Sequence, residues 1–443
     1  MNIFNKIYYR PQQNLLEFFL KVSLIMRSVN LTALVLFLVV MPKFFKRDKT
    51  KLTVLCLGRT IFLDDVAAME KFSGQLNYLV IHLKYWITII NAVTKNLSGR
   101  DRFSEEKYHL GDDLSEAQKV YYDYLSKLLP KLKKLMKFSA ILSGNFGYFP
   151  QQEIARYCLN SRLPFVVLHK EGLANVSSLE NRVMLVKNYH FLGHKLLLYN
   201  NTIKTALLSA APAGLSEEKI AVVGIPRLDY YFHLSAAPNP KRITLFSFYP
   251  SDKFFFYVDK NFSGDDKKFT LTKQKTDEFH LWVIKFALAH PDYQVFIKTK
   301  YSGHYYTYVK ELIDCASANP PLNLVLTNTQ NAHELIAKSS VVLGFYSTTQ
   351  IEALVAGRIL VSPYFGDLSP GADWDYFQKH RNLVNYARSQ QELDNCLLHA
   401  DKLTSCSLEE RNSFLREFIG ELDGFASQRA ENEIIKQIKK IAD

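Results

Sequence analysis

Cysteine is scarce in this chain of 443 residues, and its few thiols are scattered. There are five cysteines, and no two of them have CxxC spacing. An odd number of separated cysteines excludes a disulfide framework and a zinc site of paired cysteines, and it indicates a reducing compartment. The cysteines are Cys56, Cys158, Cys315, Cys396 and Cys406.

The sequence also lacks an uninterrupted apolar run long enough to cross a bilayer. The best candidate, residues 31–41 (LTALVLFLVVM), has about 11 residues, whereas a span needs roughly 20. The stretch 15–26 before it contains Lys21, and a basic run (KFFKRDKTK) follows at 43–51 without a signal-peptide cleavage site. We predict that residues 1–50 form apolar, amphipathic helices that lie on an anionic cytoplasmic leaflet. Helices packed on the protein's own core, and a tilted single-pass anchor, remain alternatives.

Hallmarks of nucleic-acid binding are missing, although the net charge is +12 and the pI is about 9.2. The chain has no Arg/Gly-rich tract, zinc-finger spacing or RNP motif. The excess positive charge therefore indicates anionic lipid or phosphorylated small molecules as partners, and we expect no nucleic acid.

Short apolar runs alternate with helical patterns from residue 51 onward, which predicts parallel α/β sheets with right-handed crossovers. The Pro-containing segment 233–242 divides this pattern, so we expect domains at 51–235 and 240–400, followed by a helical tail at 401–443. Ligands of such sheets bind at the carboxyl ends of the strands, which predicts a cleft between the two domains. Strands are expected at 51–58, 76–83, 138–144, 163–172, 194–200, 219–227, 243–250, 293–300, 322–328, 340–347 and 359–365.

The most informative segment is SVVLGFYSTTQIEALVAGR, at residues 340–358. Its apolar strand runs into Ser347, Thr348 and Thr349, which open a helix whose free N–H groups and dipole favour an anion. Glu352 follows one turn later, where it could accept hydrogen bonds from ribose hydroxyls. Alternatively, Thr349 and Glu352 form a simple capping box.

This segment resembles the donor-nucleotide motif of GT-B glycosyltransferases, in particular bacterial capsule and surface-carbohydrate enzymes of the Kdo-transferase and CDP-glycerol glycerophosphotransferase types. Three other segments support the resemblance over residues 138–365: LPFVVLHKEGL, KIAVVGIPRLDYY and AHPDYQVFIKTK. The resemblance implies two Rossmann-like domains, a nucleotide-sugar donor, and no metal or other cofactor. Asp64 and Asp65 lack the DxD spacer of a metal site and are interpreted as a helix start.

Positive charge must meet the phosphate that leaves during glycosyl transfer. The resemblance assigns Arg227, His290, Lys298 and Lys300 to the donor nucleotide. Arg227 could instead form an ion pair with Asp229, and His290 could simply end a helix.

Glu171, which follows the apolar strand FVVLH, is the predicted catalytic carboxylate. It could act as a general base or as a nucleophile. The neighbouring His169 and Lys170 could tune its pKa or bind an acidic acceptor, and Asp229 is the next candidate carboxylate. A solvated loop position is the alternative for Glu171.

The sequence thus predicts a cytoplasmic glycosyltransferase, peripheral on the inner face of the plasma membrane. It would move a sugar from a CMP- or other nucleotide-activated donor, Kdo among the candidates, to a lipid-linked capsule or lipopolysaccharide acceptor. A CDP-glycerol-type polyol-phosphate transferase is a second hypothesis, although GFYSTT lacks the Asp of the usual TD-x-SS motif. A non-catalytic glycan-binding scaffold of the same fold is a third.

Overall fold

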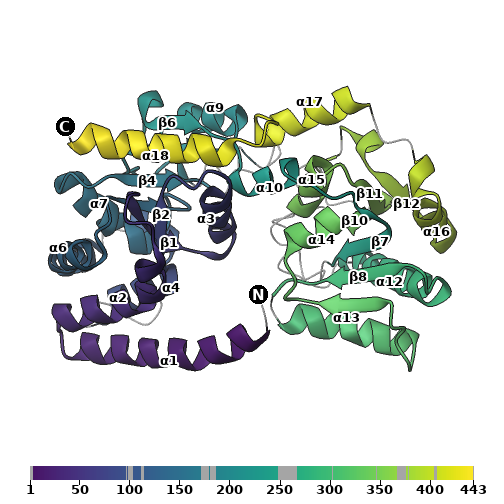
Figure 1. The fold of residues 1–443 in the computed structure, drawn as a ribbon, viewed down its shortest axis with the longest axis horizontal. Helices are drawn as coiled ribbons and strands as arrows, with labels where there is room; N and C mark the ends of the chain where they lie inside the picture. The colour runs from purple at the N-terminus through teal and green to yellow at the C-terminus, as the bar shows by residue number, and fades with distance from the viewer. Residues whose placement is uncertain are drawn as a thin grey trace. The chain divides into compact units, whose positions relative to one another are not determined.

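A computed structural model shows two compact α/β units (Figure 1). The first comprises Met1–Gly172, Glu180–Asp229 and Phe425–Asp443, and the second Leu173–Leu179 and Tyr230–Gly424. The structure describes residues 3–95, 97, 103–110, 114–170, 179, 186–247, 267–301, 303–345, 347–366, 376–377, 379–403 and 407–442.

The first unit contains a six-stranded parallel sheet with the order β2-β1-β3-β4-β5-β6. Its first strand, TVLCLG, is buried at every position, as expected for a parallel strand covered on both faces. The strands are β1 (Thr53–Gly58), β2 (Asn77–His82), β3 (Ala140–Ser143), β4 (Phe165–Leu168), β5 (Lys195–Leu198) and β6 (Ile220–Val222).

Helices surround this sheet. Their apolar faces are buried: in α6, for example, Leu125, Leu129 and Leu132 are almost fully inaccessible. The helices are α1 (Ile3–Ile25), α2 (Val29–Lys46), α3 (Thr60–Phe72), α4 (Leu83–Val93), α5 (Glu105–Leu110), α6 (Ser115–Met136), α7 (Gln152–Asn160), α9 (Asn201–Ala210) and α18 (Ala426–Ala442).

The amino-terminal helices α1 and α2 pack on the first unit. Helix α2 contacts α1, α6 and β2, and the Thr32 hydroxyl lies 2.8 Å from the Tyr124 hydroxyl of α6. By length and composition α2 could cross a membrane, with a mean hydropathy of 1.7, yet 28% of it is buried in the unit. One face of α2 is therefore part of the fold.

Helix α18 also belongs to the first unit, although it follows the second unit in the chain (Figure 1). The buried Glu431 carboxylate accepts hydrogen bonds from the Tyr78 hydroxyl at 2.7 Å and from the Gln75 amide at 2.7 Å. The expected tail at 401–443 is thus divided: α17 (Leu408–Ile419) lies in the second unit and α18 in the first.

The second unit has a six-stranded parallel sheet with the order β12-β11-β10-β7-β8-β9. Strand β7 begins at Asn239, inside the segment expected to be a linker, and the division between units falls at Asp229–Tyr230. The strands are β7 (Asn239–Phe246), β8 (Gln294–Lys298), β9 (Leu324–Thr327), β10 (Ser339–Gly344), β11 (Ile359–Pro363) and β12 (Asn385–Ala387).

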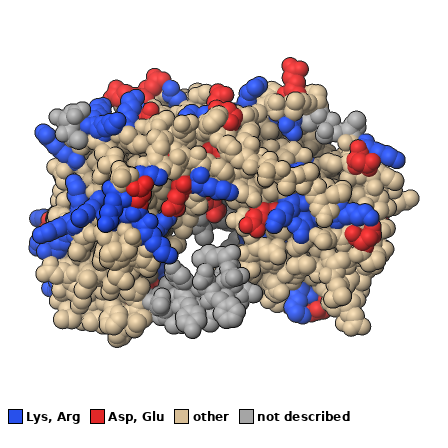
Figure 2. Space-filling view, in the orientation of Figure 1, with Lys and Arg blue, Asp and Glu red and all other residues tan. Residues whose placement is uncertain are grey.

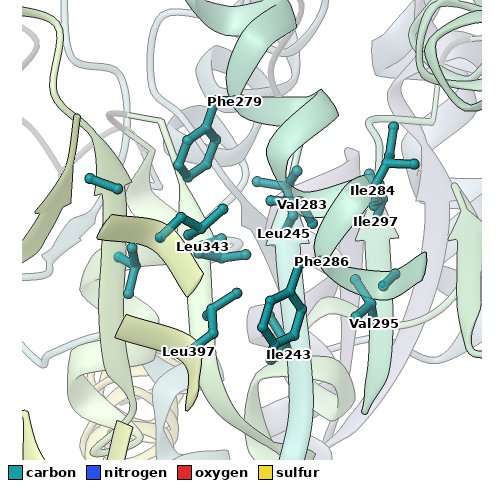
Figure 3. Packing of buried hydrophobic residues seen from close by; sticks show 14 of the residues in the cluster. Ile243, Leu245, Phe279, Val283, Ile284, Phe286, Val295, Ile297, Leu343 and Leu397 are labelled. Carbon is teal, nitrogen blue, oxygen red and sulfur yellow. The ribbon is translucent and has the colours of Figure 1, made fainter. Parts of the chain in front are cut away.

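An apolar cluster holds this second sheet to its helices. Phe279, Val283 and Phe286 of α12 pack over Ile243 and Leu245 of β7 (Figure 3). The helices are α10 (Asp229–Phe232) at the division, α12 (Lys267–Ala289), α13 (Gly303–Ala316), α14 (Ala332–Lys338), α15 (Thr348–Val355), α16 (Gln390–Leu398) and α17. Two parallel α/β units confirm the predicted GT-B-like fold class.

Candidate functional site

The second sheet has a topological switch point between β7 and β10. The chain proceeds from β7 to β8 on one side and from β10 to β11 on the other, which is the classic Rossmann order. Register pairs Gly344 with Phe246, so the two strands end side by side. Open α/β sheets bind ligands at this position, because the diverging connections leave a crevice beyond the strand ends.

Helix α15 begins at this crevice, just after β10. The Ser347 hydroxyl caps it by accepting from the Thr349 amide at 3.3 Å, and the Thr349 hydroxyl lies 3.0 Å from the same oxygen. Ser347 and Gln350 form the capping box, so the alternative pairing of Thr349 with Glu352 is wrong. The start of α15 thus brings Ser347, Thr348 and Thr349 to the edge where an anion is favoured.

The two predicted lysines reach the same edge but differ in their surroundings. Lys298 ends β8 opposite Phe246, and its ammonium donates to the carbonyls of Thr299 at 2.7 Å and Asn328 at 3.1 Å. These bonds tie β8 to the loop after β9. Lys300 is exposed, and its Nζ lies 5.5 Å from the centre of the Tyr305 ring. Lys300 is therefore the better placed of the two to meet a ligand.

Sequence reasoning missed His280, which is fully buried in α12 beneath the switch point. Its Nδ1 lies 2.7 Å from the Thr276 carbonyl, which can only accept, so Nδ1 carries the proton. Burial lowers the pKa of His280 to about 4, so the ring is neutral at pH 7 and Nε2 accepts. The Ser247 hydroxyl, 2.8 Å from Nε2, must then donate to the ring. The Ser247 oxygen is left as a fixed acceptor directly after β7.

Glu352 is buried in α15 among side chains of its own unit. Its Oε2 lies 3.2 Å from the Tyr231 hydroxyl and 3.4 Å from His333 Nδ1, and these two partners lie 2.8 Å apart. This cluster ties α15 to α10 and α14. The predicted contact of Glu352 with ribose stays a prediction, and any replacement there would also disturb this cluster.

The structure does not bring His290 to the site. His290 follows α12 and precedes β8, and residues that precede parallel strands lie at the amino edge of the sheet. Its ring packs on Phe286 with centres 4.4 Å apart, and its carbonyl accepts from Asn323 at 3.1 Å. The length of β8 separates it from Lys298, about 16 Å at a rise of ~3.3 Å per residue.

Arg227 and Asp229 are buried in the first unit. Arg227 Nη1 donates to Asp65 at 3.2 Å and to the Tyr199 hydroxyl at 2.9 Å, so among the described residues it forms an ion pair with Asp65. Asp65 lies inside α3, not at a helix start. The Asp229 carboxylate accepts from the amides of Ala426 at 3.1 Å and Ser427 at 2.7 Å at the start of α18. These contacts account for both residues without a ligand.

The first sheet has its own switch point, between β1 and β3. The Arg59 guanidinium, just after β1, lies 4.7 Å from the centre of the Tyr148 ring. His109 stacks on Tyr189 with centres 3.9 Å apart, and its Nε2 lies 2.9 Å from the Gly147 carbonyl. Sequence reasoning missed Arg59, His109 and Tyr189, although the turn-like NFG after β3 marks the place.

The segment after β4 reaches the same carboxyl edge. The Lys170 amide donates to the Gly144 carbonyl at 2.9 Å, and the buried His169 ring lies 5.5 Å from the ring of Phe146. Glu171 itself lies outside the described residues. Its neighbour Lys170 lies at the carboxyl edge of the first sheet, and this is the edge at which the sequence predicts the catalytic carboxylate.

No protein-family model matches this chain. No curated protein matches it either. Among solved structures, a Listeria monocytogenes protein assigned as a UDP-N-acetylglucosamine 2-epimerase is 13% identical, with a TM-score of 0.50 over 88% of this chain and 97% of the other. The wall teichoic acid polymerase TagF is 14% identical, with a TM-score of 0.49 over 98% of this chain and 100% of the other. At 13% identity, the similarity to the Listeria monocytogenes structure supports the fold alone.

Proposed function

We propose that this protein is a metal-independent glycosyltransferase that takes a sugar from a nucleotide-activated donor. The observation that carries the proposal is the switch point of the second sheet. There the fixed Ser247 acceptor, the Ser347–Thr349 helix start and Lys300 share the carboxyl edge of one Rossmann-like sheet.

Two of these groups, the helix start and Lys300, match the chemistry of glycosyl transfer, whereas the Ser247 oxygen can only accept and would face a hydroxyl group of the donor. When the bond from sugar to phosphate breaks, negative charge accumulates on the leaving phosphate while the sugar becomes oxocarbenium-like. Fixed N–H dipoles and an ammonium group aimed at that charge stabilise the transition state without reorganisation. The amino end of α15 would supply the dipoles and Lys300 the ammonium.

The carboxyl edge of the first sheet is the proposed acceptor side. Arg59 and Lys170 would attract an acidic glycan, and Glu171 would deprotonate its hydroxyl. The basic chain favours an anionic donor such as a CMP-activated Kdo. The polyol-phosphate transferase stays the second hypothesis, because the same helix start would also bind the phosphates of CDP-glycerol. The non-catalytic glycan-binding scaffold stays the third.

Loss of the Lys300 charge is expected to weaken nucleotide binding. A charge-assisted hydrogen bond contributes about 1.5–3 kcal/mol, so Lys300→Met should raise the Kd roughly 10- to 100-fold. Thermal shifts with CMP, CDP, UDP, GDP and dTDP identify the nucleotide, and titration of the best one gives its Kd.

Lys285→Met is the matched control, because Lys285 is an exposed lysine of α12 in the same unit. An unchanged Kd in Lys300→Met would remove Lys300 from the site. Incubation of the cognate sugar nucleotide with and without acceptor, followed by NMR, then separates the functions. Product that forms only with acceptor supports transfer, whereas a sugar altered without acceptor indicates epimerisation or hydrolysis.

We further propose that the first unit docks on the cytoplasmic membrane through α1. Large apolar side chains on its outer face are exposed at helical spacing, including Phe18 at 59% and Ile25 at 82%. Leu15 and Phe19 of α1 are exposed as well, and so is Met26, the residue directly after the helix. Helix α6 carries five exposed lysines, and Figure 2 shows basic side chains gathered over the region of α6. This combination suits anionic lipid around a lipid-linked acceptor.

Polar substitutions on this face are expected to release the protein from anionic vesicles. Each large apolar side chain stabilises by about 1.5–3 kcal/mol when buried, so Phe18→Ser/Ile25→Ser should weaken binding at least about tenfold. Sedimentation with phosphatidylglycerol-containing vesicles measures this. Point variants are preferable to deletion of residues 1–42, which would uncover the faces of α6 and β2 that α2 covers.

Leu322→Ser is the control, because Leu322 is a fully exposed apolar residue of the second unit. Equal binding by the double variant and the parent would show that α1 does not make the membrane contact.

A further inference from the structure

A cavity of about 140 Å³ lies within the second unit, at the amino edge of its sheet. It is bounded by the end of α15, the first residues of β11 and helix α17. The start of α15 lies at the opposite, carboxyl edge, so this cavity is separate from the proposed nucleotide site. Its polar lining is formed by Arg358, Asn382, Asn385 and Arg411, and most of the other lining residues are leucines.

The two arginines bring buried hydrogen-bond donors to this cavity. Within the described part of the chain, Nε of Arg358 and Nε of Arg411 are both buried and have no hydrogen-bond partner. Arg358 is anchored through Nη2, which donates to the Ala337 carbonyl at 3.0 Å. Arg411 Nη1 lies close to Gly357, whose φ of +68° excludes a strain-free side chain. The guanidinium can therefore pack against the end of α15.

No acidic residue is among the described residues that line the cavity. The nearest carboxylate in sequence, Glu410, borders the cavity: it accepts from the Ser407 amide at 3.0 Å and from the lining residue Asn382 at 3.2 Å. In the described part of the chain it forms no ion pair with Arg358 or Arg411. Asn385 donates to the Leu360 carbonyl at 3.0 Å. Two cations with uncompensated, buried N–H groups are costly, because burial removes their hydration and leaves their donors unmade.

We propose that this cavity binds a small oxyanion of the phosphate class between Arg358 and Arg411. Guanidinium groups match tetrahedral oxyanions well, because their forked donors can bond two oxygens at once. A cavity of ~150 Å³ accommodates a six-membered carbon ring, so an inorganic phosphate ion fits within this volume. The anion would supply both the missing charge and the missing acceptors.

Calorimetric titration of the full-length protein with inorganic phosphate tests the proposal, at an ionic strength held constant with chloride. We expect one site that saturates with a Kd below about 1 mM. Arg411→Gln should raise this Kd at least tenfold. Arg416→Gln, an exposed arginine of the same helix, and Lys300→Met, at the nucleotide site, should leave it unchanged.

Glycerol 1-phosphate distinguishes the sources of the anion. Binding of both ligands with similar Kd indicates recognition of the phosphate group alone, and binding of the ester alone indicates a phosphorylated metabolite. If Arg411→Gln fails to fold, Arg411→Lys keeps the charge but removes the forked donors, and it too should weaken binding. The absence of a saturable site for both ligands, or equal affinity in Arg411→Gln and the parent, would overturn the proposal. Loss of the phosphate site in Lys300→Met alone would place the anion at the nucleotide site instead.

Discussion

Replacement of Glu171 by glutamine is expected to lower kcat for sugar transfer by on the order of 100-fold or more, with nucleotide affinity unchanged. Glutamine keeps the shape of the side chain but cannot accept the proton of an acceptor hydroxyl. The preceding residue, Lys170, is fixed by its amide to the Gly144 carbonyl at the carboxyl edge of the first sheet. Ligands of parallel sheets bind at that edge.

The measurement requires the donor and acceptor identified by the nucleotide screen. Glu116→Gln provides a control, because Glu116 is an exposed carboxylate of the same unit. Turnover of Glu171→Gln within about threefold of the parent would be too small a loss for a general base, which contributes 10²–10⁴-fold. The proposed nucleotide site of the second unit does not depend on this result, because it rests on other residues.

Replacement of Asp65 by alanine is expected to destabilise the first unit by about 3–5 kcal/mol. Asp65 is fully buried and accepts from the amide and the guanidinium of Arg227 and from the Tyr199 hydroxyl at 2.8 Å. Its removal takes away the carboxylate that faces the buried Arg227 guanidinium. Urea unfolding, followed by hydrogen exchange of peptides from β1 and β3, measures the loss in this unit.

A matched pair of variants tests the cause. Asp64→Ala changes the adjacent exposed carboxylate and should cost less than about 1 kcal/mol. Asp65→Ala/Arg227→Met removes both charges, so it should recover part of the stability lost in the single variant. A loss below about 1 kcal/mol for Asp65→Ala would contradict the assigned role of the ion pair.

Eleven of the twelve described strands were predictable because each contains a short apolar run. The edge strand β12, NYA, was missed, because it is short, polar and only partly buried. The start of the second sheet was not predictable, because Pro240 made the segment resemble a linker. In the structure, Asn239 and Pro240 are exposed at the beginning of β7, a position where proline is tolerated. Only the pairing of β7 with β10, about a hundred residues later, identifies that segment as a strand.

The site was predictable where local sequence determines it. The helix start at Ser347 follows from its own hydroxyls, and His290 could have been excluded, since it precedes a strand rather than following one. The partnership of Ser247 with His280 joins a strand end to a helix 33 positions later, and no local pattern encodes it. The pairing of Arg227 with Asp65 across 162 positions is likewise a product of the tertiary fold.

The position of α18 has a consequence for synthesis on the ribosome. The first unit needs α18, because Asp229 caps that helix and Tyr78 bonds to its Glu431. Translation must therefore pass through Tyr230–Gly424 before this helix emerges, on the order of 10–40 s at ~5–20 residues per second. During that interval the nascent first unit exposes the surface that α18 later covers, and at its end all of the second unit has been made. The half of the protein that is translated first is thus the half that is completed last.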